Sequence, residues 1–175
     1  MPNISDFLAQ MSGGGARSNQ FKVTVGFPAV AMAGGETEKL EFLVRTATLP
    51  PSNIEESEVF YRGRRIPLVG DRTFEQWTMG VLNDTDFALR DAFERWSNAA
   101  AGHATPNGII NPTEYMVDFS ATQIDHNDNV LKVYTFVGGW PQNVGEISLD
   151  QSEQGTIETF DVTMSYIYWE SNTTT

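Results

Sequence analysis

The sequence predicts a mainly β protein, an antiparallel β sandwich or barrel of about seven or eight strands with one packed α-helix and one extended hairpin. Apolar and polar residues alternate with period two in most segments. Residues 84–101 are the one long segment with apolar residues at helical spacing. Clusters of Gly, Pro, Asn and Asp separate these segments and favour turns.

The chain has 175 residues, which at roughly 150 residues per domain corresponds to one domain. We assign residues 19–170 to a single β domain, residues 1–18 to a flexible N-terminal arm and residues 171–175 to a C-terminal tail.

The arm carries its own short pattern. Ile4, Phe7, Leu8 and Met11 form the apolar stripe of a short helix, and the glycines at 13–15 end it. Two interpretations remain open, a frayed terminus or a segment that docks on a neighbour.

The first strands follow the arm. Residues 21–27 alternate strictly and predict a half-buried strand. After an Ala- and Gly-rich loop over 28–38, the alternation of Leu40, Phe42 and Val44 predicts a second strand over 39–45. Pro50 and Pro51 stop it, since proline cannot donate to a strand ladder.

Residues 52–70 predict an extended hairpin whose turn contains Gly63. One arm is acidic, and the turn and the other arm are basic. It is either a solvated surface hairpin or an element that reaches a partner. The residues that we predict to make such contacts are Glu55, Glu56, Glu58, Arg62, Arg64 and Arg65.

The rest of the chain returns to strands around the helix. Residues 73–83 predict a strand, and 84–101 predict the helix, with Asp84 or Thr85 as its cap and Gly102 as its stop. Further strands are expected at 115–122, at 130–137 until Trp140-Pro141 ends it, and from Ile147. The last strand, from Phe160 to Tyr168, has the clearest alternation.

Composition and charge exclude several function classes. Acidic residues number 23 against 11 basic ones, for a net charge of −12, which argues against a general nucleic-acid binder. The surplus acid lies entirely in residues 66–175. The lack of cysteine excludes disulfides, a thiol nucleophile and cysteine-based metal sites. The N-terminus lacks the features of a signal peptide, so neither export nor a membrane partner is expected.

No catalytic or metal-binding constellation emerges from the sequence. His103 and His126 are isolated loop histidines. Residues 125–129 superficially resemble a calcium loop, but Val130 stands where that loop needs glycine and Phe136 where it needs an acid. We therefore predict no enzyme activity, no cofactor and no metal.

Two stretches carry a resemblance to a known family. The first, residues 69–84, contains Gly70, Asp71, Arg72, Thr73, Phe74 and Trp77; the second, residues 139–147, contains Trp140, Pro141, Asn143, Gly145 and Glu146. Together with residues 46–50 and the strand that ends Tyr168-Trp169-Glu170, they resemble the tail tube proteins of contractile-tailed bacteriophages. The order of elements agrees from about residue 21 to residue 170.

The resemblance implies a structural subunit that forms hexameric rings, which stack into a hollow inner tube within a contractile sheath. Strands of all subunits in a ring close one barrel, and DNA passes through its lumen into the host without specific binding. It also implies sheath, baseplate and tail terminator partners, and a place in the virion tail after synthesis in the host cytoplasm.

Two alternatives remain. Tubes of type VI secretion systems and other contractile injection machines share the fold, so an inner tube that delivers protein cargo is the first. A small β-sandwich module that binds carbohydrate or another ligand is the second. It is disfavoured because the tryptophans mostly occupy core-like positions of the strands and helix.

The residue pattern agrees with a tube in two respects. Several strands pair an apolar face with a face of small polar residues, which suits a water-filled channel. The residues that we predict to face the lumen are Thr78, Asp118, Ser120, Thr159, Asp161, Thr163 and Ser165. The charged hairpin is suited to bridge stacked rings, because a head-to-tail contact of this kind produces an open filament.

Overall fold

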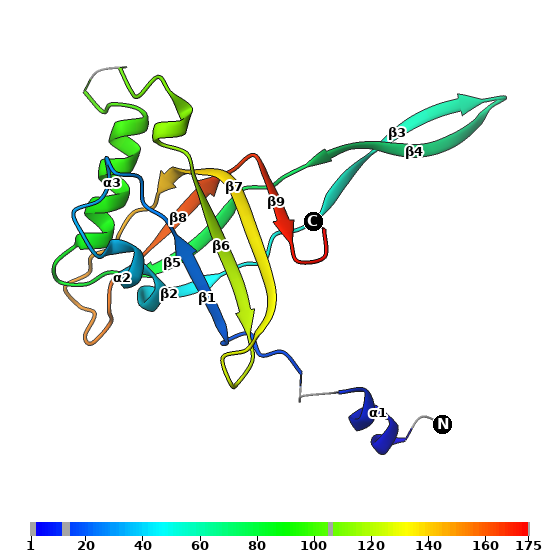
Figure 1. The fold of residues 1–175 in the computed structure, drawn as a ribbon, viewed down its shortest axis with the longest axis horizontal. Helices are drawn as coiled ribbons and strands as arrows, with labels where there is room; N and C mark the ends of the chain where they lie inside the picture. Colours follow the sequence, from blue (N-terminus) through cyan, green and yellow to red (C-terminus); the bar gives the residue numbers. More distant parts are fainter. Residues whose placement is uncertain (1–2, 12–14, 105–106, 175) are drawn as a thin grey trace.

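The computed structural model describes residues 3–11, 15–104 and 107–174. Its core is an antiparallel sheet of 7 strands in the order β1-β6-β7-β8-β5-β2, with β9 paired to β7 (Figure 1). The strands are β1 (Phe21–Val25), β2 (Val44–Ala47), β5 (Trp77–Leu82), β6 (Val117–Ile124), β7 (Val130–Val144), β8 (Thr159–Ser165) and β9 (Tyr168–Ser171). This confirms the mainly β fold class.

A separate two-stranded hairpin, β3 (Asn53–Tyr61) and β4 (Arg64–Thr73), projects far from the sheet (Figure 1). The helices are α1 (Ile4–Gln10), α2 (Glu36–Leu43) and α3 (Ala88–Ala100), and a 3-10 turn spans Pro112–Glu114. The hairpin is therefore slightly longer than the predicted 52–70. The short helix predicted in the arm is present as α1, whereas α2 was not predicted. Residues 13 and 14 of the predicted glycine stop lie outside the described residues.

The sheet folds over on itself because β7 belongs to both of its halves. Its first part pairs with β6 and β9, and its last residues pair with β8. Two glycines lie where it passes between them. Gly138 has φ +66°, and a Cβ on Gly139 would lie 2.3 Å from the ring of Phe119. Larger residues at these positions would block this close approach of strand and ring.

The two halves of the sheet enclose an aromatic core. The ring of Trp77, from β5, lies 5.1 Å from that of Phe119 on β6 and 5.3 Å from that of Phe136 on β7. The Trp77 indole N–H donates to the carbonyl of Thr48 at 2.5 Å, which satisfies its polar group. β5 and β6 therefore face each other across the core.

The helix α3 packs its apolar stripe against this core. Leu89, Ala92, Phe93 and Trp96 are buried, and Phe93 meets Phe160 of β8 edge-on. The prediction of a helix here is confirmed, but its start is wrong. Residues 84–87 form a turn, and the helix begins after Phe87, at φ +53°, with the Asp86 carboxylate accepting from the Ala88 N–H.

The predicted strand over 39–45 is wrong, because residues 36–43 form α2. The Glu36 carboxylate accepts hydrogen bonds from the amides of Ala33 and Gly34, at 2.7 and 2.8 Å, and so fixes the turn that starts the helix. Leu40 is buried while Phe42 is 81 % exposed, so their spacing does not mark one buried strand face. The strand begins only at Val44.

Three other boundaries also differ from prediction. Trp140-Pro141 does not end its strand: β7 continues to Val144 past an irregularity at Pro141, which helps it accommodate proline. Residues 146–158 contain no strand, so the strand expected from Ile147 is absent. The last predicted strand divides into β8 and β9, because the chain bends at residues 166–167 and turns back to β7.

Glu36 gives a test of this fold through pH. Burial raises the pKa of Glu36, but the Ala33 and Gly34 amides and Arg95 outweigh it, so the pKa lies below its usual 4.5. Such a carboxylate stabilises the fold above the ordinary pKa, and this contribution is lost as the pH falls through the lowered value. We expect Glu36→Gln to lower Tm near pH 7, by about 2–4 °C per kcal/mol lost.

The measurement is thermal unfolding of wild type and Glu36→Gln between about pH 7 and about pH 3, with the gap in Tm narrowing as the pH falls. Glu38→Gln, an exposed position on the same helix, is the matched control and should leave Tm nearly unchanged. An equal loss at both ends of the range would contradict this role of the Glu36 charge.

Candidate assembly surfaces

The hairpin β3–β4 turns at two residues. Tyr61 pairs with Arg64, and the residues between them, Arg62 and Gly63, have φ of +49° and +78°. Positive φ at both positions is typical of the hairpin turn whose twist matches the strands. This confirms Gly63 in the turn and puts three arginines at or beside the tip.

The predicted contact residues of the hairpin have different surroundings. Arg65 lies 2.6 Å from the carboxylates of both Glu56 and Glu58, within the same hairpin. Arg62 lies over the ring of Tyr61 at 5.4 Å. Arg64 has no ion-pair partner within the described part of the chain. Of the predicted set, Arg62 and Arg64 are therefore the cations available to a partner.

Sequence reasoning missed an apolar face of the hairpin. Cross-strand register places Val59 opposite Ile66, and Ser57 opposite Leu68, and all of these side chains are exposed. On the other face, Phe60 is 69 % and Val69 83 % exposed. The sequence carries a signal for this face in the period-two spacing of Val59 with Tyr61 and of Ile66 with Leu68. The neighbouring charged residues obscure it.

The first set of family-motif residues forms the root of the hairpin. A Cβ on Gly70 would lie 2.7 Å from the carbonyl oxygen of Glu55, at an irregularity in the strand pairing. The Arg72 guanidinium donates to the Ser52 hydroxyl at 2.6 Å. Phe74 meets Tyr166 edge-on. The first two contacts join the two strands at the hairpin root, and the contact of Phe74 with Tyr166 ties that root to the body. Trp77 then enters the core, and Asp71 and Thr73 are exposed in β4.

The second motif set lies where β7 meets β8. Trp140 and Pro141 pair with β8, and Asn143 lies opposite Thr163. The Gly145 N–H donates to the carbonyl of Asp161 at 2.7 Å, and the Arg90 guanidinium donates to the Gly145 carbonyl. Glu146 is exposed just beyond, at the start of the β7–β8 loop.

The lumen-facing predictions divide into two sets. On β5 and β8 the hydroxyls of Thr78 and Thr163 are 3.4 Å apart, and Asp161 lies opposite Gly80. Thr159 and Ser165 occupy the same face of β8, since they alternate with the buried Phe160, Val162 and Met164. This outer face of β5 and β8 is polar.

Asp118 and Ser120 lie on β6. They alternate with the buried Phe119, which meets Trp77 across the core. The outer face of β6 therefore points away from that of β5. The Asp118 carboxylate also accepts from the Gly138 N–H at 2.9 Å, next to the place where β7 changes sheet half.

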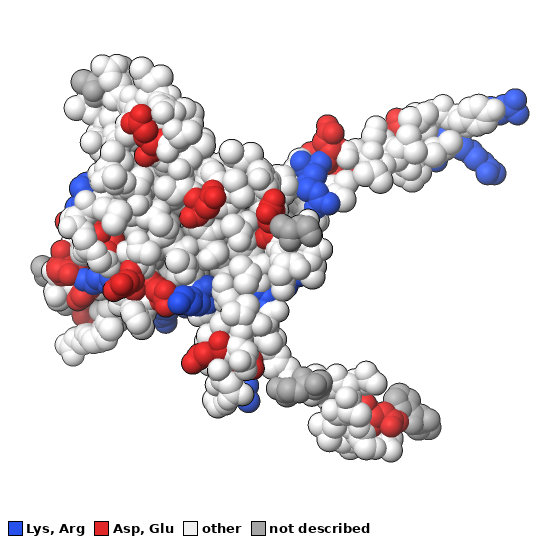
Figure 2. Space-filling model, viewed as in Figure 1, with Lys and Arg blue, Asp and Glu red and all other residues white. Residues whose placement is uncertain are grey.

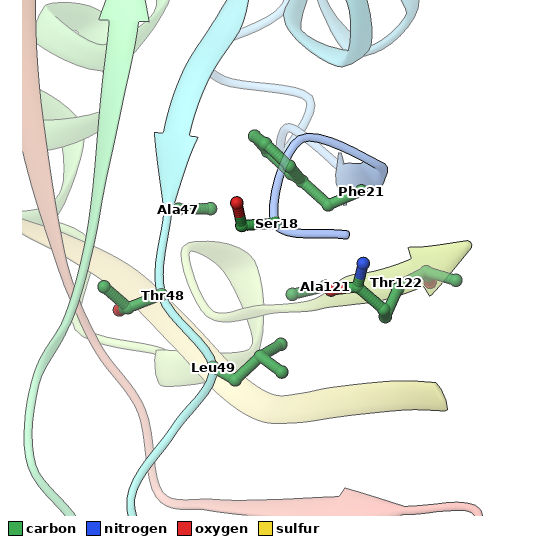
Figure 3. Close-up of a pocket in the computed structure, with 8 residues that line it drawn as sticks. Ser18, Phe21, Ala47, Thr48, Leu49, Ala121 and Thr122 are labelled. Atoms are coloured by element: carbon green, nitrogen blue, oxygen red, sulfur yellow. The ribbon is translucent and has the colours of Figure 1, made fainter. Parts of the chain in front are cut away.

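The open seam of the sandwich lies between its edge strands β1 and β2. A hollow of about 210 Å³ there is lined by Phe21 from β1, Ala47 to Leu49 from the end of β2, and Ala121 and Thr122 from β6 (Figure 3). No carboxylate or histidine lines it. The hollow therefore offers edges and small side chains rather than catalytic groups.

The two histidines and the predicted turn make local contacts. The Asp125 carboxylate accepts from the amides of Asn127 and Asn129 and from the Asn129 side chain, and these bonds lower the pKa of Asp125. The His126 ring lies 3.2 Å from the side-chain amide nitrogen of Gln20, and the His103 backbone N–H donates to the Asn98 side-chain oxygen at 3.0 Å. Within residues 3–11, 15–104 and 107–174, no three His, Asp or Glu side chains could hold a metal ion.

Charge is distributed unevenly over the surface. Figure 2 shows Lys and Arg at the outer end of the hairpin, while Asp and Glu are spread over the body.

Among the described helices, none is long and apolar enough to cross a membrane.

Comparison with solved structures shows the same fold in contractile injection machines. A chain from the sheath/tube terminator of the extracellular injection system PVC is 12 % identical, covers 90 % of this chain and 96 % of its own, and gives a TM-score of 0.65. A chain from the tube-terminating cap of the anti-feeding prophage gives a TM-score of 0.66 at 14 % identity, covering 90 and 91 % of the two chains.

Sequence comparison identifies the family. The tail tube protein of Serratia phage KSP90 is 32 % identical over 168 residues, covering 95 % of both chains. Tail tube protein gp19 of Enterobacteria phage T4 is 33 % identical over 160 residues, covering 91 % of this chain and 93 % of its own. The family described as phage tail tube protein matches residues 16–172. This chain therefore belongs to the phage tail tube proteins, a structural and non-enzymatic family of the virion tail.

Proposed function

We propose that this protein assembles into hexameric rings that stack into the hollow inner tube of a contractile phage tail, through which DNA enters the host. The observation that carries this proposal is the hairpin β3–β4, which leaves the body and exposes apolar residues on both faces. Large exposed apolar patches mark interaction sites, so we interpret this element as a surface that contacts another molecule. Family membership supports the tube as the assembly.

Rings require lateral contacts as well as stacking. The edge strands β1 and β2 each have a neighbour on one side only, so each leaves backbone groups that a strand of another copy can pair. We propose that subunits close a ring through such edges. Sheath, baseplate and tail terminator proteins are the further partners that we propose, in line with the sheath/tube and baseplate assemblies from which the structural neighbours come.

The relatives favour DNA over protein as the cargo. The injection machines share the fold, but the relatives of about one-third identity are phage tail tube proteins. DNA passage is therefore our first proposal, and an injection tube with protein cargo is the alternative. An acidic channel suits DNA, since carboxylates repel phosphates and prevent adhesion.

Assembly itself is the first test. We expect the purified protein to form long, uniform, hollow rods in negative-stain microscopy once its concentration exceeds a threshold, since stacking through repeated contacts forms an open filament. Dispersed monomers at every concentration and salt tested would contradict the proposed function.

Hairpin charge is the second test. Replacing Arg64 and Arg65 together with Glu puts new acids beside Glu56 and Glu58, so we expect a folded subunit that stacks poorly. Folding is checked by Tm, which should fall only modestly, because the two exposed ion pairs of Arg65 that are lost contribute about 0.2–1 kcal/mol each. Stacking is checked by sedimentation and microscopy. The variant with Arg64→Lys and Arg65→Lys keeps the charge and is the matched control. Normal tubes from the Glu variant would contradict a role of the hairpin charge in stacking.

The lumen assignment is the third test. We propose that the outer face of β5 and β8 lines the lumen, because none of its described large apolar side chains is exposed, whereas Tyr168 is exposed beside β7 on the other face. The chain has no cysteine, so Thr78→Cys and Ser120→Cys each introduce a unique thiol. A polymer-linked maleimide too large for the channel should label Ser120→Cys but not Thr78→Cys in assembled tubes.

Two controls frame this labelling. The same reagent should label both thiols in the free subunit, and a small maleimide that enters the open tube should label both in the assembled state. The reverse protection pattern would place Asp118 and Ser120 in the lumen instead.

A further inference from the structure

The hairpin tip has a complementary surface at the opposite end of the same molecule. The β7–β8 loop, residues 145–158, lies at the other end of the long axis from the tip of β3–β4 (Figure 1). Residues 59–68 contain three arginines and no acid, whereas residues 146–158 contain four acids and no Lys or Arg. The two ends of the subunit therefore carry opposite charge.

The charges on both sides are free to pair with another copy. Within the described residues, the side chains of Glu146 and Glu153 make no hydrogen bond or ion pair. Asp150 accepts from Ser152, and Glu158 bonds only the side-chain amide and backbone N–H of Asn83. At the tip, Arg65 is occupied by Glu56 and Glu58, which leaves Arg62 and Arg64.

Apolar surface accompanies the charge at both ends. In the loop, Leu149 is 77 % and Ile157 64 % exposed, and both line a hollow of about 260 Å³ together with Asp150 and Glu153. On the hairpin, the exposed face with Val59, Ile66 and Leu68 ends at the tip. An apolar centre surrounded by a polar rim is the usual composition of a specific interface.

We propose that the hairpin tip of one subunit docks on the β7–β8 loop of a second copy of this chain in the next ring, with Arg62 and Arg64 facing the loop carboxylates. The proposal rests on the proposed function, and names the partner surface for its stacking contact. The two surfaces lie at opposite ends of the long axis. A subunit whose tip is bound to one ring therefore still has its loop available for the ring on the other side, and the contact can repeat along an open filament.

Charge exchange tests the pairing. Reversing the tip (Arg62→Glu with Arg64→Glu) or the loop (Glu146→Arg with Glu153→Arg) should each raise the critical concentration for tube growth by roughly tenfold, the effect of a few surface ion pairs turned repulsive. Glu146 and Glu153 are chosen because they have no intramolecular partner to lose. Combining all the changes in one chain should restore growth to within about threefold of wild type, since the pairing returns with exchanged signs.

Arg62→Lys with Arg64→Lys, which keeps the tip charge, is the matched control and should grow like wild type. Growth is measured by light scattering and sedimentation, and the fold of each variant by circular dichroism. A combined variant that grows no better than either reversal, or reversals that grow normally, would overturn the contact.

Cross-linking tests the same contact independently, without changing any charged residue of the tip or the loop. Since the chain has no cysteine, a Tyr61→Cys protein and a Leu149→Cys protein can be mixed, assembled and treated with a short bismaleimide. A covalent dimer is expected from the mixture, and none from a mixture of Tyr61→Cys with Ser120→Cys. Tubes without the first dimer would overturn this contact while leaving the tube function intact, whereas wild-type protein that never forms tubes would overturn both.

Discussion

The passage of β7 between the two halves of the sheet is the constraint on which the rest of the structure depends. One strand pairs with β6 and β9 along its first part and with β8 at its end, so the sheet must fold over and bury what lies between. Gly139 allows this because Phe119 occupies the space where a Cβ would lie. The rings of Trp77, Phe119 and Phe136 then fill the interior. Which side chains of each strand point outward is set by which ones point into that core.

The hairpin obeys a different balance of forces. A two-stranded hairpin alone is marginally stable in water, and the exposed ion pairs of Arg65 with Glu56 and Glu58 contribute only about 0.2–1 kcal/mol each. Its root does more, through the Arg72–Ser52 bond, the packing of Phe74 on Tyr166, and Trp169 donating to the Pro51 carbonyl. The body therefore orients the hairpin, while its outer half leaves apolar side chains exposed.

Much of this structure could be predicted from local patterns, and the failures have physical causes. The helix with Leu89, Phe93 and Trp96 and the strands with Trp77 and Phe160 bury one face, so periodicity locates them. The segment 36–43 misled the prediction because its start is fixed by Glu36 bonding amides of the preceding turn, a contact that no periodicity records. The division of Thr78 and Ser120 between opposite faces depends on the fold of β7, and the apolar hairpin face was obscured by the neighbouring charges.

The position of the hairpin at one extremity of the subunit has a consequence for the finished assembly. A filament built by joining opposite ends of identical subunits is polar, so its two termini differ chemically. In the proposed tube, one terminus would display arginines and apolar strand residues, and the other would display carboxylates around Leu149 and Ile157. In such a tube, the proteins that start it and the proteins that stop it would have to present opposite charge, and neither could substitute for the other.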